Sequence, residues 1–183
     1  MLAIPEIDSH DHVDGPSDAP VTLLEYADFE CPVCVLAYPE IEKARAKFRG
    51  GLRYVYRHVP RSAADGFTKQ AAEASEAAAA QGKFWEMYRE LYEHPDQHHR
   101  SELLGHAQRI GLDVQRFSRE LDEHVHAPRV KELSIRALRN GVVGIPTLII
   151  NGERFEQRPS AEALERSINQ QLELLKAKKK QQP

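Results

Sequence analysis

The fold is decided by one stretch of the chain, residues 21–34, which reads VTLLEYADFECPVC. Its first part, from Val21 to Ala27, is almost continuously apolar, which is typical of a strand covered on both faces of a sheet. The two cysteines of the chain, Cys31 and Cys34, follow directly. One short bridge cannot hold a domain of this size together, so the pair is expected to matter for its chemistry.

The residues after the cysteines predict a helix and then a second strand. Apolar residues recur at helical spacing from Leu36 to Phe48, and Gly50-Gly51 is typical of a helix end. Residues 52–59 alternate and are dense in β-branched and aromatic side chains, which predicts a strand. A strand, a helix of about fifteen residues and a strand form a βαβ unit, whose strands are expected to be parallel.

A block of helices is expected to interrupt this pattern, because residues 71–80 are rich in alanine and residues 84–92 carry apolar side chains at helical spacing. Ser101, Asp113 and Pro128 suit the first turns of three further helices. The strand signal then returns at residues 147–150, before an Asn-Gly turn, a short returning strand and a last helix capped by Ser160.

These segments divide the chain into four parts. Residues 1–15 are expected to form an irregular lead-in, and residues 16–64 together with 141–176 one α/β core. Residues 65–140 would be an inserted helical subdomain, and residues 177–183 a solvated basic tail.

Composition excludes several classes of protein. With 183 residues, of which 41% are hydrophobic and 29% charged, one well-buried globular domain is expected. Lys and Arg number 25 against 28 Asp and Glu, so there is no electrostatic reason to expect nucleic-acid binding. No apolar run reaches the roughly 18–20 residues of a membrane span. The first residues do not resemble a secretory signal, which predicts a cytoplasmic protein, or a periplasmic or extracellular one if the N-terminus is processed.

The spacing of the cysteines suits disulfide exchange. Residues three apart share a helix face, and Cys31 would lie at the helix N-terminus with Pro32 in the favoured first position. Free backbone N–H groups there favour a thiolate at Cys31, whereas Cys34, one turn deeper, should keep a higher pKa. One thiol would then be a nucleophile and the other a resolving group.

Other interpretations of these residues stay open from the residues alone. The cysteines could be half of a metal site with histidines such as His10, His12 or the pair His98-His99, but these occur in polar stretches at no recognisable ligand spacing, so no metal is expected. Glu25, inside an apolar strand, could exchange protons with Cys34, or it could lie at a strand edge paired with a cation.

Four segments resemble the DsbA-like branch of the thioredoxin superfamily. They are DAPVTLLEYADFECPVC at residues 18–34, RHVP at 57–60, QGKFW at 81–85 and GIPT at 144–147. The resemblance covers about Gly15 to Leu175 with the motifs in the family's order. It implies a thioredoxin fold with an all-helical insertion between the second strand and the strand that follows a cis-proline.

The resemblance also implies roles for single residues. Cys31 would be the exposed nucleophile, Cys34 the resolving cysteine and Glu25 the buried acid that relays protons. Pro146 resembles the family's cis-proline, and Ile145 the residue whose backbone pairs with an extended substrate.

The dipeptide between the cysteines, Pro32-Val33, would also contact substrate, and it departs from the histidine-containing dipeptide of the strongly oxidising periplasmic members. Without that histidine the Cys31 thiolate loses one source of stabilisation, so a less oxidising pair is expected. His58 is expected to be a core or hydrogen-bonded histidine.

The sequence thus predicts a protein thiol–disulfide oxidoreductase. Its redox centre would be the Cys31–Cys34 pair, without a metal or an organic cofactor. The expected partners are protein or peptide thiols and disulfides, or a low-molecular-weight thiol, with neither nucleic acid nor membrane among them. Two alternatives on the same fold are a peptide-binding or chaperone-like module and a relative of glutathione transferases.

Overall fold

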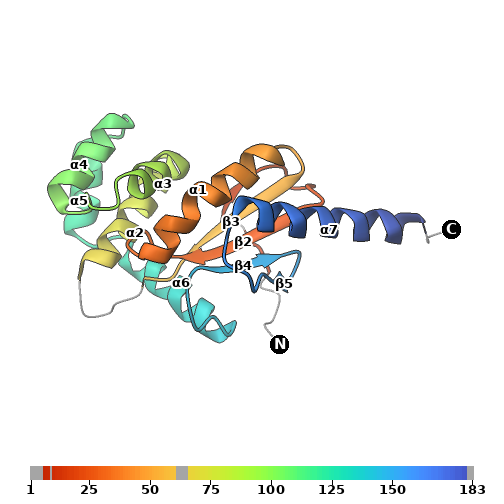
Figure 1. Ribbon diagram of the computed structural model, residues 1–183. Coiled ribbons are helices and arrows are strands. Elements are labelled where there is room, and N and C mark those ends of the chain that lie inside the picture. Colours follow the sequence, from red (N-terminus) through yellow and green to blue (C-terminus); the bar gives the residue numbers. More distant parts are fainter. Residues whose placement is uncertain (1–5, 9, 61–65, 181–183) are drawn as a thin grey trace.

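A five-stranded sheet forms the centre of the molecule (Figure 1). The computed structural model describes residues 6–8, 10–60 and 66–180. The strand order is β1-β3-β2-β4-β5. The strands are β1 (His12–Asp14), β2 (Val21–Ala27), β3 (Leu52–His58), β4 (Thr147–Ile150) and β5 (Glu153–Arg154).

The predicted βαβ unit is confirmed. β2 and β3 are parallel, in a register that runs from Val21 opposite Leu52 to Ala27 opposite His58. Helix α1 (Pro32–Lys47) connects them and ends just before the two glycines. β4 pairs with the other side of β2 in antiparallel fashion, with Tyr26 opposite Thr147. β2 is therefore the central strand.

Helices cover both faces of the sheet (Figure 1). α1 packs with the last helix, α7 (Ala161–Lys180), which also contacts β2 and β4, whereas α6 (Ala127–Arg139) contacts β3. The remaining helices pack on one another and on α6 as the inserted block between β3 and β4. They are α2 (Gly66–Ala79), α3 (Phe84–Glu93), α4 (Arg100–Arg109) and α5 (Val114–Asp122).

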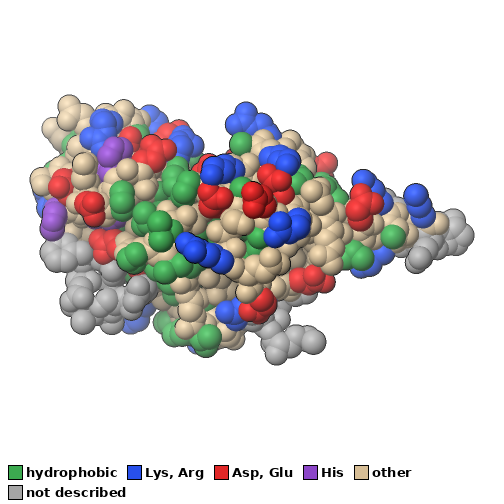
Figure 2. All heavy atoms as spheres, viewed as in Figure 1, with side chains coloured by type: hydrophobic (Ala, Val, Ile, Leu, Met, Phe, Trp, Pro, Cys, Tyr) green, Lys and Arg blue, Asp and Glu red, His purple; other side chains and the backbone are tan. Residues whose placement is uncertain are grey.

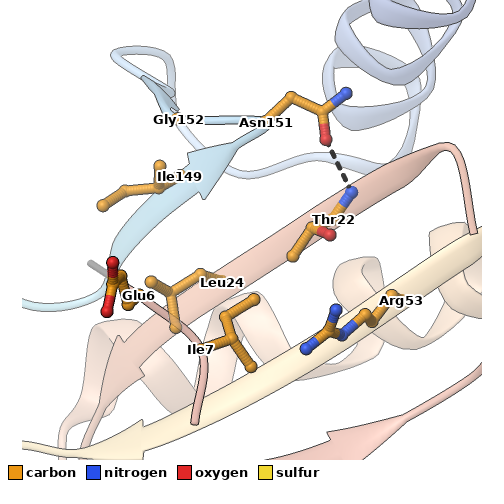
Figure 3. A pocket seen from close by; sticks show the side chains of 8 residues that line it. All are labelled: Glu6, Ile7, Thr22, Leu24, Arg53, Ile149, Asn151 and Gly152. Atoms are coloured by element: carbon orange, nitrogen blue, oxygen red, sulfur yellow. Dashed lines mark hydrogen bonds between the residues drawn. The ribbon is translucent and has the colours of Figure 1, made fainter. Parts of the chain in front are cut away.

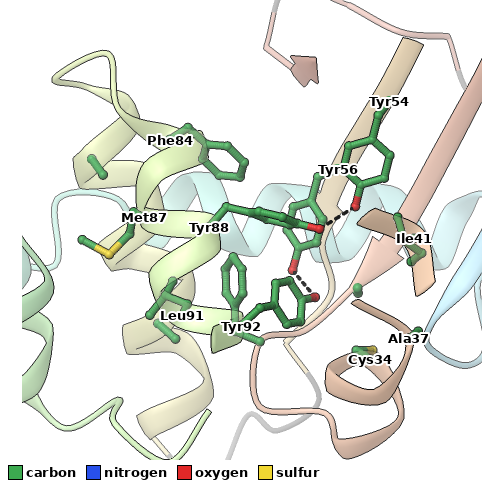
Figure 4. Packing of buried hydrophobic residues seen from close by; sticks show 14 of the residues in the cluster. Cys34, Ala37, Ile41, Tyr54, Tyr56, Phe84, Met87, Tyr88, Leu91 and Tyr92 are labelled. Atoms are coloured by element: carbon green, nitrogen blue, oxygen red, sulfur yellow. Dashed lines mark hydrogen bonds between the residues drawn. The ribbon is translucent and has the colours of Figure 1, made fainter. Parts of the chain in front are cut away.

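Successive residues of β2 enter two different apolar clusters, because side chains alternate across a strand. Leu23 and Ala27 belong to the larger cluster, which includes both cysteines and the aromatic residues of α3 (Figure 4). Leu24 and Tyr26 belong to the smaller cluster on the opposite face. The alternation places Glu25 on the same face as the cysteines.

A pocket lies on that opposite face, above Leu24 and Ile149, with Arg53 at its rim (Figure 3). None of the predicted site residues lines it. Among the described residues, no helix combines the length and the apolar character needed to cross a membrane.

Several sequence expectations differ from the structure. A short strand, β1, lies inside the expected irregular lead-in and pairs with β3. α4 begins at Arg100 with His99 at its N-cap, so Ser101 lies inside the helix. The helix expected to begin at Asp113 is α5, which ends at Asp122, and Val125 beyond it is exposed. α7 continues as a helix through Lys180.

Part of the predicted division of the chain falls outside the described residues. This applies to the start of the lead-in at residues 1–5, the boundary between core and insertion at 61–65, and the end of the basic tail at 181–183.

Candidate functional site

Cys31 is the N-cap residue of α1, as its spacing from Cys34 predicted. Its backbone is extended, with φ −77° and ψ 116°, and Pro32 opens the helix. The Cys31 carbonyl accepts the first helical bond, from the Val35 amide at 2.9 Å, and the Cys31 side chain makes no capping hydrogen bond. The Cys31 sulfur therefore lies at the end of the helix where free N–H groups favour a negative charge.

The expectation that Cys31 is exposed is wrong. The residue is only 2% exposed because it packs into the larger apolar cluster with Phe29 and Cys34. The side chains that reach solvent beside it are Val33, 53% exposed, and Leu36, 65% exposed. Leu36, expected on the buried face of α1, is instead exposed, and Figure 2 shows hydrophobic side chains gathered near the start of that helix.

Cys34 lies one turn deeper and is fully buried. Both cysteines are free thiols, and the Cys31 thiol is within hydrogen-bonding reach of Cys34. Burial raises the pKa of the Cys34 thiol well above its ordinary value, and the negative charge of Glu25 raises it further. The expected higher pKa of Cys34 is confirmed, and it means that Cys34 needs a base to act as a nucleophile.

Glu25 occupies the middle of the central strand, opposite Tyr56 on one side and Leu148 on the other. It is 1% exposed, so its placement at a strand edge is excluded. The Tyr54 hydroxyl donates a hydrogen bond to its carboxylate. Burial raises the pKa of Glu25 to about 7, although the hydrogen bond from Tyr54 and the charge of Arg45 act in the opposite direction.

A layer of buried tyrosines surrounds Glu25, and the sequence reasoning missed it as part of the site. Tyr54 and Tyr56 come from β3, and Tyr88 and Tyr92 come from α3 (Figure 4). The hydroxyls of Tyr54 and Tyr88 lie 3.0 Å apart, and those of Tyr56 and Tyr92 lie 3.2 Å apart. The sequence pattern places each pair of tyrosines on one face of its element, because Tyr54 and Tyr56 are two residues apart on a strand and Tyr88 and Tyr92 four apart on a helix. The sequence does not show that β3 and α3 pack together, so it could not bring the two pairs into one layer.

The loop before β4 carries the other predicted site residues. The peptide bond between Ile145 and Pro146 is cis. Ile145 packs against both apolar clusters, one of which contains the two cysteines. Because Thr147 lies opposite Tyr26, this loop is level with the end of β2, where the chain turns toward the motif.

The histidines considered as partners of the cysteines have different surroundings: His12 lies in a group with His58 and Glu76, whereas His98 is buried 3.5 Å from Glu30. Among the described residues, two groups could hold a metal ion, namely His12, His58 and Glu76, and Glu90, His94 and His106. Glu76 accepts from His12 at 2.9 Å and lies 3.2 Å from His58, so its carboxylate already joins the two rings. Neither group includes a cysteine. The expectation that His58 is a buried, hydrogen-bonded histidine is confirmed.

Two relatives match this chain over most of its length but only a part of theirs. The Na(+)/H(+) antiporter NhaA 3 of Salinispora tropica is 40% identical over 167 residues, covering 91% of this chain and 26% of that protein. The Na(+)/H(+) antiporter NhaA of Herminiimonas arsenicoxydans is 39% identical over 156 residues, covering 85% and 25%. The chain therefore spans about a quarter of the length of the curated relatives it matches.

Solved structures share the fold at low sequence identity. BdbD from Bacillus subtilis superimposes with a TM-score of 0.78 at 24% identity, covering 88% of this chain and 92% of that one. Alpha-DsbA1 of Wolbachia pipientis gives a TM-score of 0.82 at 18% identity and covers 97% of both chains.

The family model described as Thioredoxin matches residues 8–170, which include the sheet, the helical insertion and both cysteines. The chain therefore belongs to the thioredoxin family, and its fold is that of the DsbA-like members.

Proposed function

We propose that this chain is a thiol–disulfide oxidoreductase whose redox centre is the Cys31–Cys34 pair. The observation that carries the proposal is the coupling of Cys34 with Glu25. Cys34 is buried and its pKa is raised, so the thiol needs a base, whereas the neighbouring Glu25 has a pKa of about 7 and can take up a proton at neutral pH. A purely structural cysteine would need no such partner.

The reaction in the reducing direction has two steps. The Cys31 thiolate attacks a substrate disulfide, so a mixed disulfide forms and one substrate sulfur leaves as a thiolate. Cys34 then gives its proton to Glu25 and attacks the Cys31 sulfur, which closes the Cys31–Cys34 bond and releases the second substrate thiolate. Two electrons pass from the cysteine pair to the substrate. The same steps run backwards when a substrate is oxidised, and the electrons stay on sulfur, so no metal or organic cofactor is required.

The surface beside the motif suits a polypeptide substrate. Val33 and Leu36 are both more than half exposed, so they offer apolar contact area next to the cysteines. The backbone of Ile145 is the proposed partner for an extended chain, with Pro32 and Val33 as further contacts. A low-molecular-weight thiol is the alternative reductant or product in this scheme.

The proposal is tested by insulin reduction and by trapping. The wild-type protein should reduce insulin disulfides, Cys31→Ser should not, and Cys34→Ser should accumulate mixed disulfides with its substrates. If the wild type had no turnover while a Cys31→Ser, Cys34→Ser double variant still bound peptides, the peptide-binding alternative would replace the enzyme. We also propose that the Cys31–Cys34 pair is less oxidising than the pair in members with a histidine between the cysteines. Equilibration of the protein with glutathione measures this redox equilibrium.

A further inference from the structure

Among the described residues, Tyr54 connects Glu25 with a surface pocket. Tyr54, itself 1% exposed, donates its hydroxyl hydrogen to Glu25 and also lines a surface pocket of about 500 Å³. Cys34, on the same face of the sheet as Glu25, is fully buried in the larger apolar cluster (Figure 4). Tyr54 therefore contacts Glu25 through its hydroxyl and also forms part of the pocket wall.

This pocket lies away from the substrate side of the motif. It is lined by Glu42 and Arg45 from the last turns of α1, by Arg49 just after that helix, and by residues around Gly15 and Leu52. Cys34 and Arg45 are eleven residues apart on the same helix, which corresponds to about 16 Å along its axis. The pocket can thus stay open to water while a substrate covers the cysteines.

Charged groups line the pocket next to Tyr54. The Arg45 guanidinium lies 4.3 Å from the centre of the Tyr54 ring and 5.7 Å from that of Tyr88. It also forms ion pairs with Asp14 and Glu42. A cation over the tyrosine rings stabilises negative charge on their hydroxyls and on Glu25, whereas the Glu42 carboxylate opposes it.

We propose that the Tyr54 hydroxyl carries the proton released by Cys34 from Glu25 to water in the pocket beside Arg45. The proposal rests on the function proposed above, and it adds the route by which the acid is reset after each cycle. The protonated Glu25 gives its proton to the Tyr54 oxygen while Tyr54 gives its own proton to a water molecule. No electrons move in this step, the tyrosine ends unchanged, and Glu25 is again a carboxylate.

Groups on three elements influence Glu25 through charge or a hydrogen bond. Tyr54 and Tyr56 face it from β3, and Tyr88 and Tyr92 from α3. Cys34, Arg45 and Glu42 act on it from α1. Only Tyr54 in this set both hydrogen-bonds Glu25 and lines the pocket. Tyr56 is the matched control, since it is equally buried on the same strand and its hydroxyl pairs with Tyr92.

The experiment follows the second sulfur step by the colour of thionitrobenzoate. A mixed disulfide of Cys31 with thionitrobenzoate is formed at acidic pH, where Glu25 is protonated, and the pH is then raised rapidly in a stopped-flow instrument. In a second arrangement, the reduced protein is first equilibrated at the final pH. It is then mixed with an excess of dithiobis(nitrobenzoate), the symmetrical disulfide of thionitrobenzoate. Both arrangements are run over a range of final pH for the wild type, Tyr54→Phe, Tyr56→Phe and Glu42→Gln.

Tyr54→Phe should release the second thionitrobenzoate with a delay after the pH jump, about tenfold or more slower than in the pre-equilibrated arrangement, because Glu25 cannot shed its proton quickly. Its pH midpoint should also move upward, since a hydrogen bond to the carboxylate is lost. Tyr56→Phe, which keeps the hydrogen bond from Tyr54 to Glu25, should show no such delay between the two arrangements. Glu42→Gln, which leaves the tyrosine layer intact, should move the midpoint downward.

The possible outcomes separate this inference from the function on which it rests. If the wild type released no second thionitrobenzoate, the oxidoreductase proposal itself would fail. If the wild type did so and Tyr54→Phe showed a shifted midpoint without a delay, Tyr54 would be a hydrogen-bond partner only, and the relay would be refuted. A Tyr54→Phe variant that followed the same course as Tyr56→Phe would refute it as well.

Discussion

Replacing Glu25 by glutamine should change how the stability of the protein depends on pH. Glutamine has nearly the same shape and can still accept the hydrogen bond from Tyr54, but it does not ionise. Burial is the largest influence on Glu25 and raises its pKa from 4.5 to about 7 in the folded protein. The carboxylate form is therefore the destabilised one, and the cost appears only when Glu25 loses its proton.

The magnitude follows from the linkage between proton binding and folding. Below pH 4.5 Glu25 is protonated in both the folded and the unfolded state and contributes no difference. As the pH rises from 4.5 through about 7, the unfolded state ionises first, so the folded state loses stability. Each pKa unit is worth about 1.4 kcal/mol. The full loss is therefore about 3 kcal/mol and is reached above pH 7.

Urea unfolding of the reduced wild type and of Glu25→Gln between pH 4 and pH 8 measures this effect. The free energy of unfolding of the variant, minus that of the wild type, should grow by about 3 kcal/mol across this range. Comparing the two proteins cancels the titration of other groups, except those that Glu25 itself influences. A difference that stays constant with pH would refute the claim that Glu25 is an acid with a raised pKa in a dry site.

Three further predictions concern the substrate surface and the frame of the site. Leu36→Glu should reduce kcat/KM for insulin about tenfold while leaving the rate with a small disulfide reagent unchanged, because it removes apolar contact area outside the reacting atoms; equal losses with both substrates would contradict a docking role. Arg57→Met should destabilise the protein by about 3–5 kcal/mol in urea unfolding, because it leaves the buried carboxylate of Asp11 without its partner; a loss within 1 kcal/mol would mean that water reaches this pair. Asp113→Ala should cost about 1 kcal/mol by removing the cap that accepts from the Arg116 amide at 3.0 Å, and Asp113→Asn should restore most of it, with thermal unfolding as the measurement; an alanine variant as stable as the wild type would exclude this cap as a source of stability.

The core of the fold was predictable because its local signals agree with one another. The apolar run from Val21 to Ala27, the proline after Cys31 and the glycines after α1 all indicate a βαβ unit, and the structure has it. The short strand β1 was not predictable in this way. Three residues carry too little pattern to distinguish a strand from a loop, and β1 exists because β3 offers it a free edge.

The exposure of the residues in the motif was predicted less well than their positions. Helical spacing assigned Leu36 to the buried face of α1, yet it points to solvent, whereas Cys31, expected at the surface, is buried. Helical periodicity describes a helix packed along its whole length. The first turn of α1 instead contributes Cys34 to a cluster that also packs against Ile145, and packing between segments more than a hundred residues apart cannot be read from local spacing.

The buried acid and the tyrosines around it are best understood together. A leucine or valine at position 25 would continue the apolar pattern of β2 without the cost of burying a carboxylate, so local packing alone does not explain Glu25. The layer against which it packs is equally uncommon, since all four tyrosines there are buried and their hydroxyls are joined in two pairs. A hydroxyl can donate to a carboxylate and, after turning, accept from a carboxylic acid, so it can satisfy Glu25 in both protonation states. Phenylalanine could fill the same space but could satisfy neither state. Glu25 interrupts the apolar pattern of β2, and the hydroxyls of the tyrosines packed around it compensate for this interruption. This combination suits a carboxyl group that must gain and lose a proton inside the core.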